Sequence, residues 1–385
     1  MSNLPSQPLL QPPTRWVWFW GLALLLTLLA CPGLTEPTPQ LIASHLGIPW
    51  GMAQWDDNHI LVTERTGKLY RVNLNSGAIT EIIGVPEVYA RGQGGLLDIA
   101  IDTSNPTHNC SERWLYFTYS KPVAGGAATT LARAQLHGQQ LSQWQDLLIT
   151  TPASRTHKHF GSRIAIRNDK LFFGVGERGH RPNAQDLSNH AGKILRLNLD
   201  GTVPTDNPFR TTANAQPEIW SYGHRNPQGL CFDEQGRLWE AEHGPRGGDE
   251  INQIQPGANY GWPLVSFGKE YYGPFSVGNG TELPGINGPV KVYIPSIAPG
   301  SLLCLPQGRA NTTRLLLGAL ALKHINWVEI NEAGEAVAEI RLQEALQQRI
   351  RSLLLARNGD LLFATDSGNL YRLPGFSEHS ALLVR

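Results

Sequence analysis

Short apolar segments recur along the chain in a fixed order, and turns rich in Gly, Asn and Asp separate them. In each recurrence an apolar strand leads through a turn to a second strand, and a Gly-rich gap leads to a third. The first and last copies, which both end in Gly-x-Leu-Tyr-Arg, comprise residues 51–53, 59–64 and 67–72, and residues 352–356, 360–365 and 368–373. Self-similar strand groups at a period of roughly 50 to 70 residues predict a β-propeller.

Four further copies lie between these two, so the pattern predicts an all-β protein, a six-bladed β-propeller with four-stranded antiparallel blades. They comprise residues 96–101, 114–119 and 131–136; 163–166, 170–176 and 192–197; 229–232, 237–242 and 250–254; and 301–305, 314–320 and 325–330. Residues 337–348 have helical periodicity, and because strands flank them we interpret them as a loop insertion or a short helix. The propeller is expected to be one domain over residues 41–385.

The N-terminal segment does not follow this pattern. Residues 16–30 form one apolar run with the length of a signal-peptide core, shorter than the ~20 residues of a comfortable membrane span. The run ends in Leu-Leu-Ala-Cys, which is similar to a bacterial lipobox with Cys31 as the lipidated residue; a cleaved signal peptide and an uncleaved anchor are the alternatives. We therefore assign residues 1–31 to a signal or membrane anchor and residues 32–40 to a Pro-rich tether. The rest is expected to be exported, either periplasmic or anchored to the membrane and facing the periplasm.

The charge content bears on the class of partner, and the cysteine content bears on disulfides and metal sites. The 385 residues include 32 Lys and Arg and 32 Asp and Glu without a basic cluster, which argues against nucleic acid. Besides Cys31, the chain contains Cys110, Cys231 and Cys304, with no CxxC spacing. This pattern allows at most one disulfide and an odd thiol and disfavours a zinc site, so the cysteines are expected to pack as small apolar residues.

Polar residues stand beside the first strand of several predicted blades. The inner strands of a propeller and their loops converge on its central channel, so these side chains are expected to meet at one mouth. A histidine there can serve as a general base, or it has a structural role. Arginines there would bind a polyanionic ligand, or they pair with loop carboxylates. The residues are Gln93, His159, Arg225 with Asn226, and Arg349 with Arg351.

A second polar cluster, residues 242–250, follows an apolar strand. It combines the backbone carbonyls of a Gly-Pro turn with Asp249 and Glu250, and Tyr260 follows ten residues after Glu250. Hard oxygen donors of this kind suit Ca²⁺, which accepts mixed carbonyl and carboxylate ligands. The alternative interpretation is a solvated acidic turn.

Together these phrases resemble the soluble quinoprotein glucose and aldose sugar dehydrogenases, a family of six-bladed propellers that use pyrroloquinoline quinone (PQQ). The resemblance extends from about Pro49 to Leu373, and the phrases follow one another in the family's order. It is carried by residues 92–98, 159–163, 192–198, 206–209, 225–229, 242–252 and 259–263.

The resemblance implies a role for each matching residue. His159 matches the general base that takes the proton of the anomeric hydroxyl of a sugar while hydride passes to PQQ. Arg225 matches the residue that stabilises the charge developing on PQQ, and Asn226 and Gln93 match contacts to the quinone. Arg349 and Arg351 match the pair that holds the PQQ carboxylates. Gly244 and Pro245 match carbonyl ligands of a calcium ion that bridges to PQQ. Glu250 and Tyr260 match a second, structural calcium site.

The chain departs from the family at three places. The family's Lys against PQQ follows a strand ending in Gly-Ala-Leu, whereas here the Lys comes later, at Lys323, so either Lys323 reaches the cofactor from a shifted position or one cationic contact is missing. Ile294 stands where glucose-oxidising members carry an aromatic residue, with Ser296 nearby in place of Thr. Residues 267–273 lack the Asp that some members use at the second calcium site.

The leading hypothesis is therefore a PQQ-dependent aldose dehydrogenase that oxidises the C1 hydroxyl to a lactone and passes electrons to an external acceptor. Its substrate preference is expected to depend on the loops at residues 121–130 and 268–289. A calcium-dependent lactonase-type propeller is a second hypothesis, disfavoured because arginines rather than carboxylates are expected at the channel mouth. A non-catalytic propeller that binds a glycan or a protein is the third.

Overall fold

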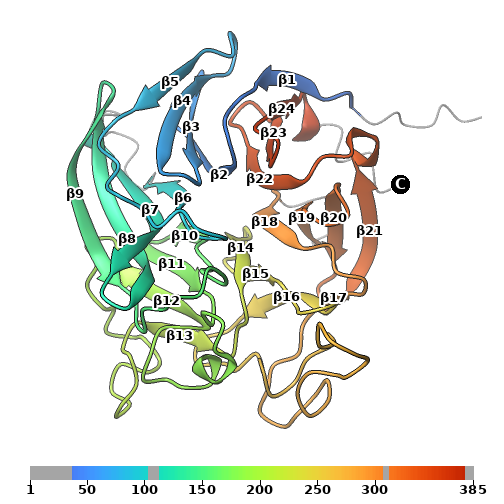
Figure 1. Ribbon diagram of the computed structural model, residues 1–385. Coiled ribbons are helices and arrows are strands. Elements are labelled where there is room, and N and C mark those ends of the chain that lie inside the picture. Colours follow the sequence, from blue (N-terminus) through green and yellow to red (C-terminus); the bar gives the residue numbers. More distant parts are fainter. Residues whose placement is uncertain (1–36, 103–111, 307–311, 378–385) are drawn as a thin grey trace, which may run out of the picture. The chain divides into compact units, whose positions relative to one another are not determined.

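The computed structural model describes residues 37–102, 112–306 and 312–377, and in this part of the chain it shows six four-stranded antiparallel sheets arranged in a ring (Figure 1). The predicted six-bladed propeller is thus confirmed. Blades one to three consist of β2 (Pro49–Gln54), β3 (His59–Glu64), β4 (Lys68–Asn73) and β5 (Ile79–Ile82); β6 (Leu96–Ile101), β7 (Trp114–Val123), β8 (Gly126–His137) and β9 (Gln140–Ile149); and β10 (Ile164–Arg167), β11 (Lys170–Val175), β12 (Lys193–Asn198) and β13 (Ile219–Tyr222).

Blades four to six continue the same order along the chain. They consist of β14 (Pro227–Phe232), β15 (Leu238–Glu242), β16 (Asp249–Ile254) and β17 (Lys291–Tyr293); β18 (Pro299–Cys304), β19 (Thr313–Ala319), β20 (Ile325–Ile330) and β21 (Ala336–Leu342); and β22 (Ile350–Leu355), β23 (Leu361–Thr365), β24 (Leu370–Leu373) and β1 (Gln40–Ala43). The first strands of neighbouring blades, from β2 round to β22, contact one another and form the inner ring.

The ring closes through the N-terminal strand. Strand β1 pairs antiparallel with β24, with Gln40 opposite Arg372 and Leu41 opposite Tyr371, so the sixth blade contains strands from both ends of the propeller (Figure 1). The carbonyl oxygen of Pro37 accepts a hydrogen bond from Gln343 Nε2 at 2.9 Å. The proposed signal or anchor, residues 1–31, lies outside the described residues. No helix within the described ranges has the length and apolar character needed to cross a membrane.

Alternating side chains explain why the blades stack. Successive residues of a strand point to opposite faces of the sheet. On β19, Leu315 and Leu317 pack with Trp239 of blade four, whereas Leu316 packs with Leu353 and other residues of blade six. The middle strand β19 is therefore buried against neighbouring blades on both faces, which is why such middle strands are nearly continuous apolar runs.

A buried guanidinium ties the inner ring together. Arg163, which directly precedes β10, donates to Asp98 Oδ1 of β6 at 2.8 Å and to the carbonyl oxygen of Gln228 of β14 at 2.9 Å. Its Nη2 donates to the carbonyl oxygens of Gly300 of β18 and Arg351 of β22 at 2.6 and 3.0 Å. Arg163 and its immediate partners thus connect the inner strands of five blades.

Two local expectations need correction, and the cysteines form the one disulfide that the sequence allowed. Residues 337–348 belong to the outer strand β21 (Ala336–Leu342) and a following single 3₁₀ turn, Glu344–Leu346; the helical spacing of Leu342, Ala345 and Leu346 falls on the strand end and this turn. Residues 121–130 belong to the β7–β8 hairpin and are not a long loop. Cys231 and Cys304 do pack against apolar residues, but they also form one disulfide between β14 and β18 with a Cα–Cα distance of 5.7 Å. Cys110 lies outside the described residues.

Candidate active site at the channel mouth

His159 lies in a tight loop that leads into β10. Its φ is 58°, a left-handed conformation that side chains other than glycine adopt infrequently. The end of β11 passes so close that a Cβ at Gly176 would lie 2.3 Å from the His159 carbonyl oxygen and 2.9 Å from Asn226 Oδ1. Only glycine at position 176 therefore allows His159 and Asn226 to take their places.

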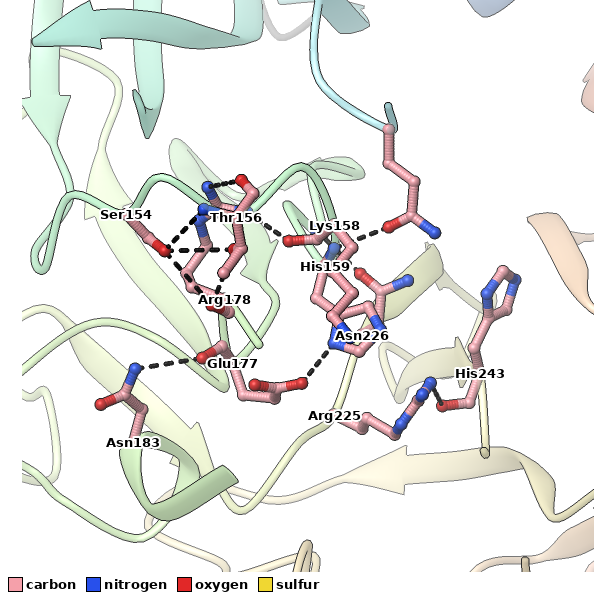
Figure 2. A network of polar contacts seen from close by, with 12 residues as sticks. Ser154, Thr156, Lys158, His159, Glu177, Arg178, Asn183, Arg225, Asn226 and His243 are labelled. Atoms are coloured by element: carbon pink, nitrogen blue, oxygen red, sulfur yellow. Dashed lines mark hydrogen bonds and ion pairs between the residues drawn. The ribbon is translucent and has the colours of Figure 1, made fainter. Parts of the chain in front are cut away.

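The His159 ring is paired with a buried carboxylate (Figure 2). Its Nδ1 is hydrogen-bonded to Glu177 Oε1, and His159 and Glu177 are 7% and 1% exposed. Because a carboxylate only accepts, Nδ1 carries the proton and Nε2 is left as an acceptor. Burial lowers the pKa of His159 below its usual value, and the positive charge of Arg225 lowers it further although Glu177 opposes both. The ring is therefore neutral and able to accept a proton near pH 7.

A buried arginine fixes the segment that presents His159. Arg178 stacks on Phe160, with its guanidinium carbon 3.5 Å from the ring centre. It also donates to the carbonyl oxygens of Lys158 and Thr156 (Figure 2). Burial lowers the pKa of Arg178 to about 10, which leaves it charged at neutral pH. From the other side, Gln93 Oε1 accepts from the His159 backbone N–H at 2.6 Å. The position of His159 thus depends on groups from two blades.

Arg225 and Asn226 precede β14 and are oriented through their backbone. The Glu242 carboxylate accepts from both of their N–H groups, at 2.5 and 3.1 Å. The Arg225 side chain donates to the His243 carbonyl oxygen at 2.9 Å, and none of its bonds among the described residues is to a carboxylate side chain (Figure 2). Asn226 Oδ1 accepts from Gly161 N, whereas its buried Nδ2 has no protein partner in the described part of the chain. An unsatisfied buried donor indicates a binding position.

A cavity of about 240 Å³ opens beside these groups, and we call it the arginine cavity. Arg349 donates from Nε to Asp366 Oδ2 at 2.8 Å, and Arg351 donates to both oxygens of the same carboxylate at 2.8 and 3.0 Å. The two arginines thus pair with a loop carboxylate and also line the cavity. The lining residues are Ile48, Trp50, Arg65, Gly92, Gln93, Gln228, His243, Ala298, Leu320, Arg349 and Arg351.

Lys323 does not line this cavity. It lies in the turn between β19 and β20 with a φ of 57°, and the lining residue from this turn is Leu320. The carbonyl oxygen of Leu320 accepts from Arg349 Nη1 at 3.0 Å. The structure therefore leaves the cavity without a lysine from this turn.

The segment with the calcium pattern is not a solvated turn, so that alternative is wrong. Asp249 is fully buried and accepts from the backbone N–H groups of Gly244 and Ala298 at 2.9 and 2.7 Å. A Cβ at Gly244 would lie 2.2 Å from the Gly248 carbonyl oxygen, so the chain folds back on itself here. Gly244 lines a pocket together with Arg225, His243 and Glu250. The predicted metal residues therefore lie next to Arg225.

Buried carboxylates gather beneath this turn. Burial raises the pKa of Glu240 and of Glu250, and the nearby Glu242 raises both further. Glu240 Oε1 has no hydrogen-bond partner among the described residues, and one ligand atom each of His224, Glu240 and Glu242 lie within 4.8 Å of one another. The Tyr260 hydroxyl donates to Gln253 O at 2.7 Å and accepts from Gln255 N at 2.8 Å, which favours its carbonyl oxygen as the atom for a metal.

The region expected to select the substrate reaches the same mouth. Tyr271, 66% exposed, accepts at its hydroxyl from Arg225 Nη2 at 3.3 Å. Glu270, in the segment that lacks the family's Asp, is bound by both terminal nitrogens of Arg181 at 2.6 and 2.8 Å. Ile294 is 68% exposed, and the Ser296 hydroxyl donates to Asp249 Oδ2.

Sequence reasoning missed several residues of the site. Glu177 follows the apolar strand β11 by two residues, and nothing in its local pattern marks it as the partner of His159. His243 lines both pockets and its Nε2 lies 2.7 Å from the Pro299 carbonyl oxygen; burial lowers its pKa to about 4, so it remains neutral. Trp50, whose ring lies under the Arg351 guanidinium at 4.4 Å, and Arg65 were also missed.

The fold and this site define a propeller with a histidine–carboxylate pair beside an arginine-rich cavity at the mouth of its channel. The chain belongs to the glucose/sorbosone dehydrogenase family, whose model matches residues 46–372. It is 37% identical to the aldose sugar dehydrogenase YliI of Escherichia coli over 350 residues, which is 87% of this chain and 92% of that protein. It is 35% identical to quinoprotein glucose dehydrogenase B of Acinetobacter calcoaceticus over 261 residues, 59% of this chain and 52% of that one. The PQQ-bound aldose sugar dehydrogenase of Streptomyces coelicolor has a TM-score of 0.71 and 26% identity, covering 88% of this chain and 99% of that chain.

Proposed function

We propose that the protein is a PQQ-dependent aldose dehydrogenase that oxidises the C1 hydroxyl of sugars to lactones and passes the electrons to an external acceptor. The observation that carries this proposal is the neutral His159, held by Glu177, beside a cavity with more guanidinium groups than carboxylates. Membership in the family and the quinoprotein relatives support it.

The residues present fit PQQ, which is an aromatic tricarboxylate. Arg349 and Arg351 would hold carboxylates, and Gln93, Asn226 and Arg225 would contact the quinone; the unpartnered Nδ2 of Asn226 is a donor for a quinone oxygen. When bound, PQQ supplies a two-electron acceptor for hydride. Its anionic groups would also offset the positive charge that the arginines concentrate in the cavity.

His159 would remove the proton. Nε2 is the nitrogen that accepts the proton of the anomeric hydroxyl, and the Glu177 carboxylate at Nδ1 stabilises the imidazolium that forms. Arg225, charged and without a carboxylate partner in the described structure, is available to stabilise negative charge that develops next to it. Proton removal and charge stabilisation thus come from adjacent loops.

Calcium ions would bind at the turn after β15. The Gly244 and Pro245 carbonyls would hold the ion beside the cofactor, and the Glu250 carboxylate with the Tyr260 carbonyl oxygen would hold a second, structural one. Buried carboxylates with raised pKa values and an unpartnered oxygen favour a cation there.

Export is supported by the Cys231–Cys304 disulfide, since such bonds persist in oxidising compartments.

The proposal is tested by dye-linked oxidation of a panel of aldoses by the purified full-length protein, before and after addition of PQQ and Ca²⁺. Activity is expected only with both additions. Titration of the same protein with PQQ provides a second readout. A protein that neither binds PQQ nor oxidises any aldose would overturn the proposed function and favour the binding propeller.

Calcium is also expected to stabilise the fold. A ligand that binds only the native state at a hundred times its Kd adds about 2.7 kcal/mol to the free energy of unfolding. We expect Ca²⁺ to raise the Tm of chelator-treated protein, and Glu250→Gln to remove part of this gain. Glu270→Gln, which changes a carboxylate paired with Arg181 on the nearby loop, is the matched control and should keep the gain. An equal Tm gain in wild type and Glu250→Gln would exclude Glu250 as a ligand.

A further inference from the structure

Arg65 enters the arginine cavity from a blade that the family resemblance does not assign to cofactor binding. It follows β3, and its backbone is fixed on both sides: its N–H donates to Ile48 O at 3.0 Å and its carbonyl oxygen accepts from Leu96 N at 3.1 Å. A Cβ at Gly95 would lie 1.8 Å from the Arg65 carbonyl oxygen, so Gly95 is required for this close approach. Arg65 is therefore held firmly between the first two blades.

The Arg65 guanidinium uses only one of its three nitrogens for hydrogen bonds to the described part of the protein. Its Nη1 donates to the Gly92 carbonyl oxygen at 2.9 Å and more weakly to that of Gly94 at 3.4 Å. Across the described ranges, its Nε and Nη2 have no hydrogen bond to the protein and no carboxylate pairs with it. The adjacent Glu64 is not its partner, because that carboxylate accepts from the backbone N–H groups of Ile48 and Thr66.

The other two guanidiniums of the cavity are more fully engaged. Arg349 and Arg351 share the single carboxylate of Asp366, and Arg351 uses both Nε and Nη2 on it. Three arginines therefore line the arginine cavity, and Asp366 is the carboxylate that pairs with two of them. Arg65 contributes the charge that no protein group neutralises, and a planar fork with two unused donors is suited to a carboxylate.

We infer that Arg65 binds a carboxylate of PQQ and supplies the cationic contact that Lys323, outside the cavity lining, does not make. This inference rests on the proposed function, because it specifies a further residue of the same cofactor site. The cofactor is thereby held by arginines from the first and the sixth blade, which are neighbours in the ring.

The test is calorimetric titration of the metal-loaded, cofactor-free full-length protein with PQQ, which needs no turnover. Arg65→Gln is expected to raise the Kd for PQQ about tenfold or more, as for the loss of a charged hydrogen bond. Arg65→Lys should recover part of the affinity, since it keeps the charge but not the fork. Arg71→Gln, which removes the same charge from the outward-lying β4 of the same blade, is the matched control. Unchanged Tm values would establish that each variant is folded.

The possible results distinguish a failure of the Arg65 inference from a failure of the proposed function. Binding of PQQ to the wild type together with an unchanged Kd for Arg65→Gln would overturn the role of Arg65 alone. The same conclusion would follow if Lys323→Gln weakened binding and Arg65→Gln did not. Absence of PQQ binding to the wild type would instead overturn the proposed function.

Discussion

Replacing His159 by alanine is expected to lower kcat/KM for aldose oxidation about 10²- to 10⁴-fold, the usual contribution of a positioned general base. The His159 imidazole has Nε2 as an acceptor at the buried mouth of the channel, because Glu177 holds the proton on Nδ1. The affinity for PQQ should change little. The measurement is steady-state oxidation of the best aldose by PQQ- and Ca²⁺-loaded protein.

The matched control is His157→Ala, two residues away in the same loop. The His157 side chain is exposed and contacts Tyr89, so its removal should leave kcat/KM within about twofold of wild type. Equal losses for both histidines would show that the loop was disturbed and would contradict the role of His159 as base.

The dependence of this rate on pH follows from the lowered pKa of His159. A base whose pKa is lowered stays unprotonated to lower pH, so kcat/KM should hold below the ordinary imidazole value of about 6.5 and decline only in more acidic solution. Glu177→Gln removes a group that raises the pKa, so it should move this decline further towards acid and also lower the plateau. A decline above pH 6.5 would be inconsistent with this assignment.

Arg163→Met is expected to destabilise the native state by about 3 to 5 kcal/mol, as when one partner of a buried ion pair is removed. The substitution leaves the buried Asp98 carboxyl without its ion-pair partner and leaves three carbonyl oxygens without their donor. Urea unfolding followed by tryptophan fluorescence would report the change. Arg163→Lys, which keeps the charge but not the fork, should fall between the variant and wild type.

Arg167→Met, at the opposite end of β10 from Arg163, is the control for this measurement. Arg167 is only partly buried and donates to the carbonyl oxygens of Asp233 and Glu234 at the far end of β10. Its replacement should cost no more than about 1 kcal/mol. Equal costs for Arg163→Met and Arg167→Met would contradict the central role of Arg163 in the inner ring.

The fold was predictable because the inner strands of a propeller are buried on both faces and therefore repeat as apolar runs. The outer strands were harder to recognise, since an edge strand such as β21 has one solvated face and Val337 is 56% exposed. Strand β1 is only four residues long and its first two are exposed, so it carries little signal of its own. Its pairing with β24 joins the two ends of the propeller sequence, which no local pattern predicts.

The ring of residues at the mouth was predictable for a related reason: His159, Arg225 and Arg349 all precede inner strands, and topology brings such positions together. Their partners were not predictable. Glu177 and Asp366 meet the histidine and the arginines through the ends of other strands, β11 and β23. Arg65 follows Glu64 in a polar turn, and only the structure shows which of these two residues lines the cavity.

The pairing of β1 with β24 has a consequence for how the chain folds. The strand nearest the N-terminus emerges early during synthesis, whereas its partner, Leu370–Leu373, is among the last parts to become available. The sixth blade therefore cannot be completed until almost the whole chain is present, and contacts so distant in sequence are slow to form. A chain with this topology therefore stays open until its last strands are available, and its ring closes only then.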